Sequence, residues 1–181
     1  MKKAQLLLVC LLALTACNSN KISYNGFSLS FPEPYIIDNI DKFGADRYYL
    51  LSNEDAPKNF AYIQVMPDYV ANSGLSDPTN LDISQQMLLL IDELADNFFF
   101  SEDGVEIDED FGFTIKTPER EDIIPNATAE LRGAYDGLPF RAYFAADLWG
   151  DNMVVSLFCA EDDNEMKKQI QEIFLTYEWH I

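Results

Sequence analysis

The chain has 181 residues, and its 12 basic and 31 acidic side chains give a formal net charge of −19 at pH 7. So acidic a protein repels phosphate groups, which excludes nucleic-acid binding and argues against electrostatic attachment to anionic lipid. The length suits one domain with a hydrophobic core. Three cysteines and one histidine are too few for the usual transition-metal sites.

Residues 1–16 have the pattern of an export signal. Lys2 and Lys3 precede an uncharged, mostly apolar stretch over residues 4–16. This stretch is too short for a membrane-spanning helix, which needs about 20 apolar residues. We therefore expect a signal peptide that is removed, which makes the mature chain more acidic still.

The end of this stretch carries a specific motif. Leu14, Thr15, Ala16 and Cys17 resemble the lipobox of bacterial lipoproteins, in which small residues let the extended peptide enter a peptidase. The resemblance implies that cleavage follows Ala16 and that Cys17 carries a diacylglyceryl group. Two or more acyl chains hold a protein stably at a membrane. The alternative is a plain secretory signal with an incidental cysteine.

The sequence after the lipobox indicates a location. Residues 17–23 are expected to be the lipidated cysteine and a polar tether, and residues 24–181 one globular domain. Asn18 stands where aspartate retains many Gram-negative lipoproteins in the inner membrane, so the resemblance favours the outer membrane. The first acidic residue is Glu33, and the lack of an acidic run beside Cys17 favours the periplasmic face.

Three short strands are expected early in the domain. The alternation over residues 28–31 ends at Pro32 and indicates an opening strand. Residues 47–52 and 61–66 have strand composition, and the polar residues 53–59 between them form a loop.

An amphipathic helix is expected after a loop at residues 70–80. Asp82 and Gln85 have the spacing of a capping box at its start. Other apolar residues lie outside the main stripe, so the helix should be buried against a sheet. The stripe consists of Ile83, Met87, Leu90, Ile91, Leu94 and Phe98.

The strongest pattern is a three-stranded meander over residues 127–160. Asp136 and Gly137 suit a type I′ turn, because both tolerate positive φ, and this turn sets Leu131 opposite Ala142. One face of the meander is apolar throughout. The other face is mixed, which predicts a sheet covered at least partly on both sides.

A second helix should begin after Glu161, where Asp162 and Glu165 have capping-box spacing. A closing strand is expected at residues 176–179. The fold class is α+β: a central antiparallel sheet flanked by helices, an α/β/α sandwich. The apolar stripe of the second helix consists of Met166, Ile170, Ile173 and Phe174.

With these elements the chain resembles the PsbP-like and DcrB-like superfamily. The resemblance rests on the opening strand at residues 26–32, the long helix, the run 133–159 and the closing unit at 170–179. It implies a sheet between helices and a non-enzymatic role, because such proteins are mostly extrinsic or lipid-anchored binding proteins, chaperones and assembly factors. It transfers no catalytic or metal-binding residue.

The sequence nominates no catalytic group and no cofactor. Nucleophilic hydrolysis needs a serine or cysteine beside a base, and the one histidine, His180, lies beside the C-terminus. Cys159 falls on the apolar face of the meander, where a small buried hydrophobe is the preferred interpretation over a reactive thiol. Carboxylates are numerous, but no pair suggests glycoside hydrolysis.

An acidic run around Gly104 leaves calcium binding open as an alternative. Glu106, Asp108 and Asp110 would share one face of a strand, but the EF-hand pattern is absent. A charged sheet edge that blocks edge-to-edge pairing is the preferred interpretation, so no metal site is predicted. The run comprises Glu102, Asp103, Glu106, Asp108, Glu109 and Asp110.

Three aromatic residues are candidate interface residues. Trp149 is expected at a hairpin tip, with Tyr143 and Phe158 on the second face of the meander. A tip tryptophan can anchor an interface or merely cover the hairpin end. The favoured hypothesis is a non-catalytic protein-binding or assembly module, held at the membrane by the lipid on Cys17 and bound to another envelope protein. The alternatives are a small-molecule or glycan-binding lipoprotein and a carboxylate hydrolase.

Overall fold

The structure, a computed structural model, describes residues 20–74, 80–108 and 127–180. The N-terminal strands are β1 (Asn20–Tyr24), β2 (Phe27–Phe31), β3 (Tyr35–Phe43), β4 (Asp46–Asn53) and β5 (Phe60–Met66). The later strands are β6 (Val105–Ile107), β7 (Ala127–Tyr135), β8 (Leu138–Trp149), β9 (Asn152–Ala160) and β10 (Glu178–Trp179). The helices are α2 (Tyr69–Asn72), α3 (Asn80–Ala95), its π-helical end η1 (Asp96–Phe100), α4 (Asp163–Glu172) and the 3-10 turn η2 (Phe174–Thr176).

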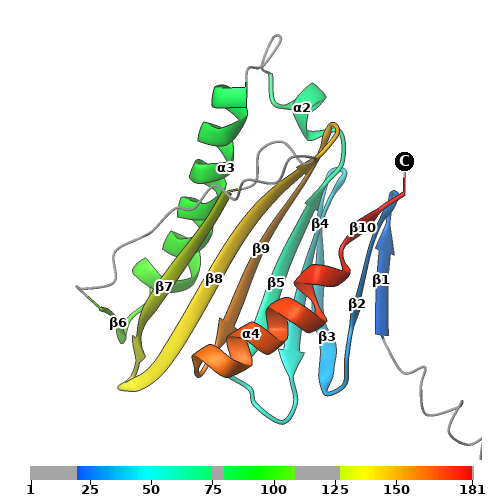
Figure 1. Cartoon of the computed structure of the whole chain (residues 1–181). Helices are drawn as coiled ribbons and strands as arrows, with labels where there is room; N and C mark the ends of the chain where they lie inside the picture. Colours follow the sequence, from blue (N-terminus) through cyan, green and yellow to red (C-terminus); the bar gives the residue numbers. More distant parts are fainter. Residues whose placement is uncertain (1–19, 75–79, 109–126, 181) are drawn as a thin grey trace, which may run out of the picture.

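The strands form two antiparallel sheets. The larger has the order β3-β4-β5-β9-β8-β7-β6, and the smaller has the order β1-β2-β10. In Figure 1 the large sheet runs across the molecule, with α4 in front of it. The predicted α+β class with an antiparallel central sheet is confirmed.

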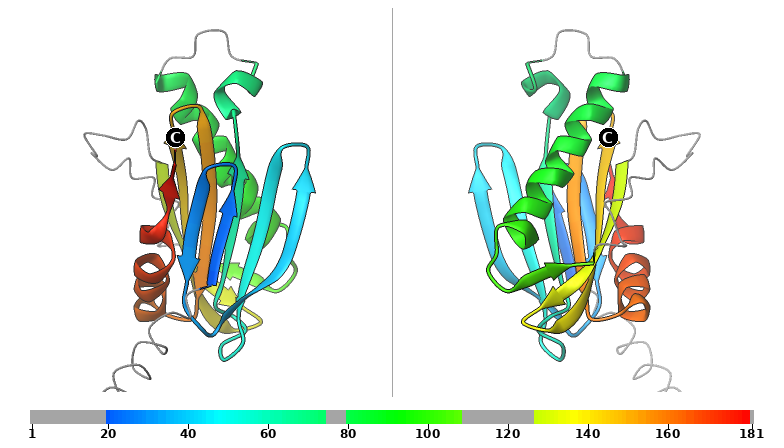
Figure 2. Two further views of the ribbon diagram at one scale, coloured as in Figure 1. Left: turned by 90° about the vertical axis from the view of Figure 1, so that its right-hand side faces the viewer. Right: turned by 90° about the vertical axis from the view of Figure 1, so that its left-hand side faces the viewer.

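Both faces of the large sheet are covered, as Figure 2 shows edge-on. On one face α3 and η1 bury Met87, Ile91 and Phe99 against the sheet. On the other face, α4, η2 and the small sheet form a second core that includes Phe27 and Met166. The large sheet is therefore the middle layer, as the mixed second face of the meander predicts.

The meander at residues 127–160 is confirmed in position and register. Leu131 lies opposite Ala142, and the turn residues Asp136 and Gly137 have φ values of 50° and 76°. Two positive φ values define a type I′ turn, whose backbone twist matches that of the flanking strands.

The long helix begins earlier than its sequence suggests. Asp82 lies in the first turn of α3, so the predicted cap at Asp82 is wrong, although an acidic residue there still favours the positive end of the helix dipole. Ile83, Met87 and Ile91 of the predicted stripe are buried. The helix ends in the π-helical turn η1, which orients Phe99 toward the sheet core.

The C-terminal segment follows its prediction closely. Asp162 caps α4, because its Oδ1 accepts hydrogen bonds from the backbone N–H groups of Asn164 at 2.8 Å and Glu165 at 3.0 Å. The predicted closing strand is β10, which pairs with β2. Thr176 adds a side-chain tie, since its Oγ1 contacts both backbone groups of Ser30.

Two N-terminal features differ from the sequence-based expectation. The tether expected over residues 17–23 is too long, because β1 begins at Asn20 and Ile22 is buried. The strand β3 was not expected, and it pairs along nearly its full length with β4.

Candidate functional site

The three predicted interface aromatics do not form an exposed surface. Phe158 is completely buried, so its assignment as an interface residue is wrong. It packs with its ring centroid 5.9 Å from that of Phe174, which covers this face of the sheet. Tyr143 lies under the same ring at 6.1 Å, and burial raises the pKa of Tyr143 to about 12.

Trp149 lies at the end of the β8–β9 hairpin, where the sequence places it. It is half-buried and faces a small hollow of about 60 Å³ lined also by Phe174, Leu175 and Tyr177. Its backbone oxygen accepts a hydrogen bond from Nδ2 of Asn152 at 3.2 Å. Trp149 therefore covers the hairpin end, and this position does not favour a role as an interface anchor.

Cys159 is buried, and residues 102–108 of the acidic run lie in the described part of the chain. Burial raises the pKa of the Cys159 thiol to about 12, so the thiol is neutral. In the described part of the acidic run, Glu106 lies on the short edge strand β6, and no cluster of acidic, cysteine or histidine residues that could hold a metal occurs in the described ranges. Glu109 and Asp110 lie outside the described residues.

The outer edge of β3 is the most apolar exposed strand surface of the described chain. β3 is the last strand of the large sheet, and every residue after Tyr35 in it is exposed. Ile40 is 47% exposed and Phe43 76% exposed. Long, apolar sheet edges are normally blunted or covered, because their unpaired backbone groups bind other strands. The large exposed side chains are Ile36, Ile37, Ile40 and Phe43.

A second candidate site is a hollow of about 500 Å³ between η1 and the sheet. Small-molecule sites usually enclose about 300–1,000 Å³ of mostly apolar space. Two ring pairs form much of the wall: Phe60 and Phe98 stack with centroids 5.8 Å apart, and Phe99 and Phe140 at 4.8 Å. Cys159 also lines this hollow. The charged groups of the lining are Asp38, Lys58 and Glu102.

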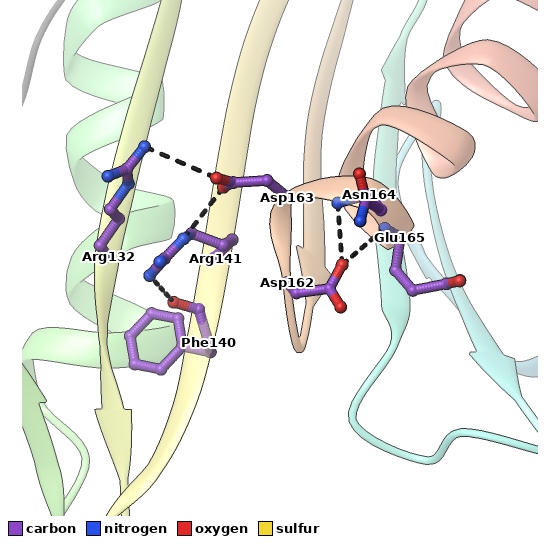
Figure 3. Close-up of polar contacts among 7 residues, drawn as sticks. All are labelled: Arg132, Phe140, Arg141, Asp162, Asp163, Asn164 and Glu165. Atoms are coloured by element: carbon purple, nitrogen blue, oxygen red, sulfur yellow. Dashed lines mark hydrogen bonds and ion pairs between the residues drawn. The ribbon is translucent and has the colours of Figure 1, made fainter.

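A third hollow, of about 250 Å³, lies beside the start of α4 and has both charged and apolar residues in its lining. Arg132 and Arg141 lie directly opposite each other on β7 and β8. Asp163 lies between them, with Oδ1 3.0 Å from Nε of Arg141 and Oδ2 4.0 Å from a guanidinium nitrogen of Arg132 (Figure 3). The cationic groups are thus engaged by α4, and the cluster joins the helix to the sheet.

Comparison with known proteins identifies the fold. The sequence matches no family model and no curated protein. The structure is similar to the solution structure of cyanobacterial PsbP from Synechocystis, with a TM-score of 0.59 and 11% identity over 89% of this chain and 92% of that one. A structure from Bacteroides thetaiotaomicron has a TM-score of 0.47 and 13% identity over 90% of this chain and 49% of that one.

The class defined by these observations is a PsbP-like α+β domain. The likeness to cyanobacterial PsbP establishes the fold alone. The lipobox residues Leu14, Thr15, Ala16 and Cys17 lie outside the described residues. Within the described ranges, no helix has the length and apolar character needed to cross a membrane.

Proposed function

We propose that this protein is a lipid-anchored, non-catalytic binding domain of the cell envelope that holds another envelope protein through the outer edge of β3. The observation that carries the proposal is the exposed apolar edge itself. A segment of a partner would add to the large sheet as a further strand, with backbone hydrogen bonds giving affinity and alternate side chains giving specificity.

The side chains on β3 indicate what such a segment would contain. Ile37 and Ile40 offer apolar contacts, and Asp38 and Asp41 place two carboxylates along the same strand. With the negative charge of the whole chain, this arrangement favours a partner segment that carries both apolar and basic residues. The bulge between Ile37 and Asn39 would restrict the alignments available to that segment.

The lipobox supports the location of this activity. Acylation of Cys17 and cleavage after Ala16 would leave the domain close to the membrane, because β1 begins only three residues after the lipidated cysteine. Asn18 favours the outer membrane, and the lack of nearby acidic residues favours the periplasmic face. The partner would then be a protein of the same membrane or of the adjacent periplasm.

A crosslinked pull-down of the full-length lipoprotein from its native envelope tests the proposal. The test variant is Ile40→Lys with Phe43→Lys, which places two positive charges on the exposed edge without touching the core. We expect the wild-type protein to capture a specific envelope protein and the variant to lose it, because like charges and lost apolar contact both oppose strand addition.

Two controls make the result specific to the edge and to the anchor. Leu89 on α3 is 60% exposed, so Leu89→Lys changes a comparable exposed apolar residue elsewhere and should retain capture. Cys17→Ala should remain folded but leave the membrane fraction. Equal capture by the β3 variant and the wild-type protein would contradict the proposed binding edge, and membrane retention of Cys17→Ala would contradict the proposed anchor.

A further inference from the structure

The hollow at the end of α3 has the size and lining of a small-molecule site. Its wall comes from segments far apart in the chain: Phe98 and Phe99 on η1, Phe60 on β5 and Phe140 on β8. Together they present aromatic and aliphatic surface that an apolar molecule would remove from water. Ser52, half-buried on β4, lies in the same lining.

The charged groups of this hollow favour one sign of ligand charge. Asp38 on β3 and Glu102 after η1 contribute two exposed carboxylates, whereas Lys58 contributes one exposed ammonium group. The chain as a whole carries a formal charge of −19. Both the local balance and the field of the whole protein therefore attract a cation and repel an anion.

We propose that this hollow binds an apolar organic cation: a molecule with an aromatic or aliphatic body and one ammonium group. The body would lie against the phenylalanine rings, and the ammonium group would lie near Asp38 and Glu102. Aromatic rings also stabilise ammonium groups placed over their faces. Fatty acids and other apolar anions would instead bring negative charge to a lining in which carboxylates outnumber cations.

A dye-displacement experiment tests the proposal. The protein is the chain without residues 1–16 and with Cys17→Ala, which retains every described strand and helix and needs no detergent. The neutral dye N-phenyl-1-naphthylamine reports on occupancy of the hollow. Three competitors share the same ring system and differ in charge: 1-naphthylmethylamine is a cation, 1-naphthalenemethanol is neutral, and 1-naphthylacetate is an anion.

We expect the amine to displace the dye at the lowest concentration and the carboxylate at the highest. The amine should bind about five- to tenfold more tightly than the carboxylate at low salt, and the difference should shrink in high salt because the rim is exposed. Ser52→Phe, which places a further ring in the lining and reduces the space, should weaken dye binding. Equal binding of amine and carboxylate, or undiminished dye binding by folded Ser52→Phe, would overturn the proposal.

Charge variants separate the local carboxylates from the overall acidity. Asp38→Asn with Glu102→Gln should remove most of the preference for the amine. Asp151→Asn with Glu178→Gln makes the same change in net charge at exposed positions outside the hollow and should retain the preference. If both double variants lose the preference equally, the hollow does not select charge through its own rim, and the proposal fails. Dye displacement needs no partner protein, so its failure is distinguishable from a failure of the pull-down that tests the edge of β3.

Discussion

Arg141 donates a hydrogen bond of 3.0 Å from its Nε to Oδ1 of Asp163, which fixes the first turn of α4 on strand β8 (Figure 3). Arg132 lies opposite Arg141 across the β7–β8 pair. Two like charges placed opposite each other destabilise a sheet, and the carboxylate of Asp163 between them offsets this repulsion. The first turn of α4 thus places a carboxylate beside the two arginines of the sheet.

Asp163→Asn is expected to destabilise the protein by about 0.5–1 kcal/mol. The amide retains the shape of the side chain but cannot neutralise the two guanidinium groups. Chemical denaturation of both proteins at low and high salt checks this. The difference should be largest at low salt, because Asp163 is 57% exposed and salt screens it. A difference that does not respond to salt would show that packing, not charge, accounts for the effect.

Asp162 should make the stability of α4 depend on acid pH. Backbone hydrogen bonds from Glu165 and Asn164 hold the pKa of its carboxyl below the ordinary value of 3.8. Because the folded pKa is lowered, the stabilisation is present above pH 4 and is lost as the pH falls through the folded pKa. Asp162→Asn keeps a capping acceptor and cannot titrate. Its melting temperature should lie below that of the wild-type protein at pH 7 and approach it near pH 2; a constant gap would refute this assignment.

Tyrosine ionisation should limit stability at alkaline pH. Burial raises the pKa of seven tyrosines above the ordinary value of 10.0, so they stay protonated in the folded chain after the unfolded chain has released its protons. Stability is therefore complete below pH 10 and is lost as the pH rises further. Absorbance at 295 nm should show a late, cooperative tyrosinate transition that coincides with loss of far-UV circular dichroism, whereas gradual titration of a folded protein would contradict it. These residues are Tyr35, Tyr48, Tyr49, Tyr62, Tyr69, Tyr143 and Tyr177.

Gly133 is required for the packing of β6 beside the hollow. A Cβ at this position would collide with the backbone oxygen of Glu106 and lie 3.0 Å from the ring of Phe140. Gly133→Ala should therefore cost about 1–3 kcal/mol and weaken binding of the neutral dye, since Phe140 lines the hollow. Gly44 has a φ of +59° but open space around it, so Gly44→Ala should cost about 1 kcal/mol from backbone strain and leave dye binding unchanged.

Elements with strong local signals were predictable from the sequence. The turn at Asp136 and Gly137 determines the meander register, and the alternation on both sides of it specifies the buried faces. Asp162 and Glu165 mark the start of α4 through a local capping pattern. In each case the determining residues are close together in the chain, so the local structure can be predicted from the sequence alone.

The features proposed to carry function depend on residues far apart. β3 escapes prediction because it buries only Tyr35, so its sequence lacks the alternation that marks a half-buried strand. The aromatic hollow requires Phe60, Phe98 and Phe140 to meet, and their sequence spacing does not indicate this. Conversely, the sequence places Phe158 on the second face of the meander as a candidate interface residue, but Phe174, which follows α4, covers it.

A partner protein that pairs with the outer edge of β3 at the membrane should lie within reach of a crosslinker placed on that strand. Site-specific photocrosslinking in the native envelope tests this pairing, with benzoylphenylalanine at Asp41 on β3 and, as the matched control, at Leu89 on α3. We predict a discrete crosslinked product from position 41 that disappears with Cys17→Ala, and none from position 89. A product from position 89 without one from position 41 would contradict the claim.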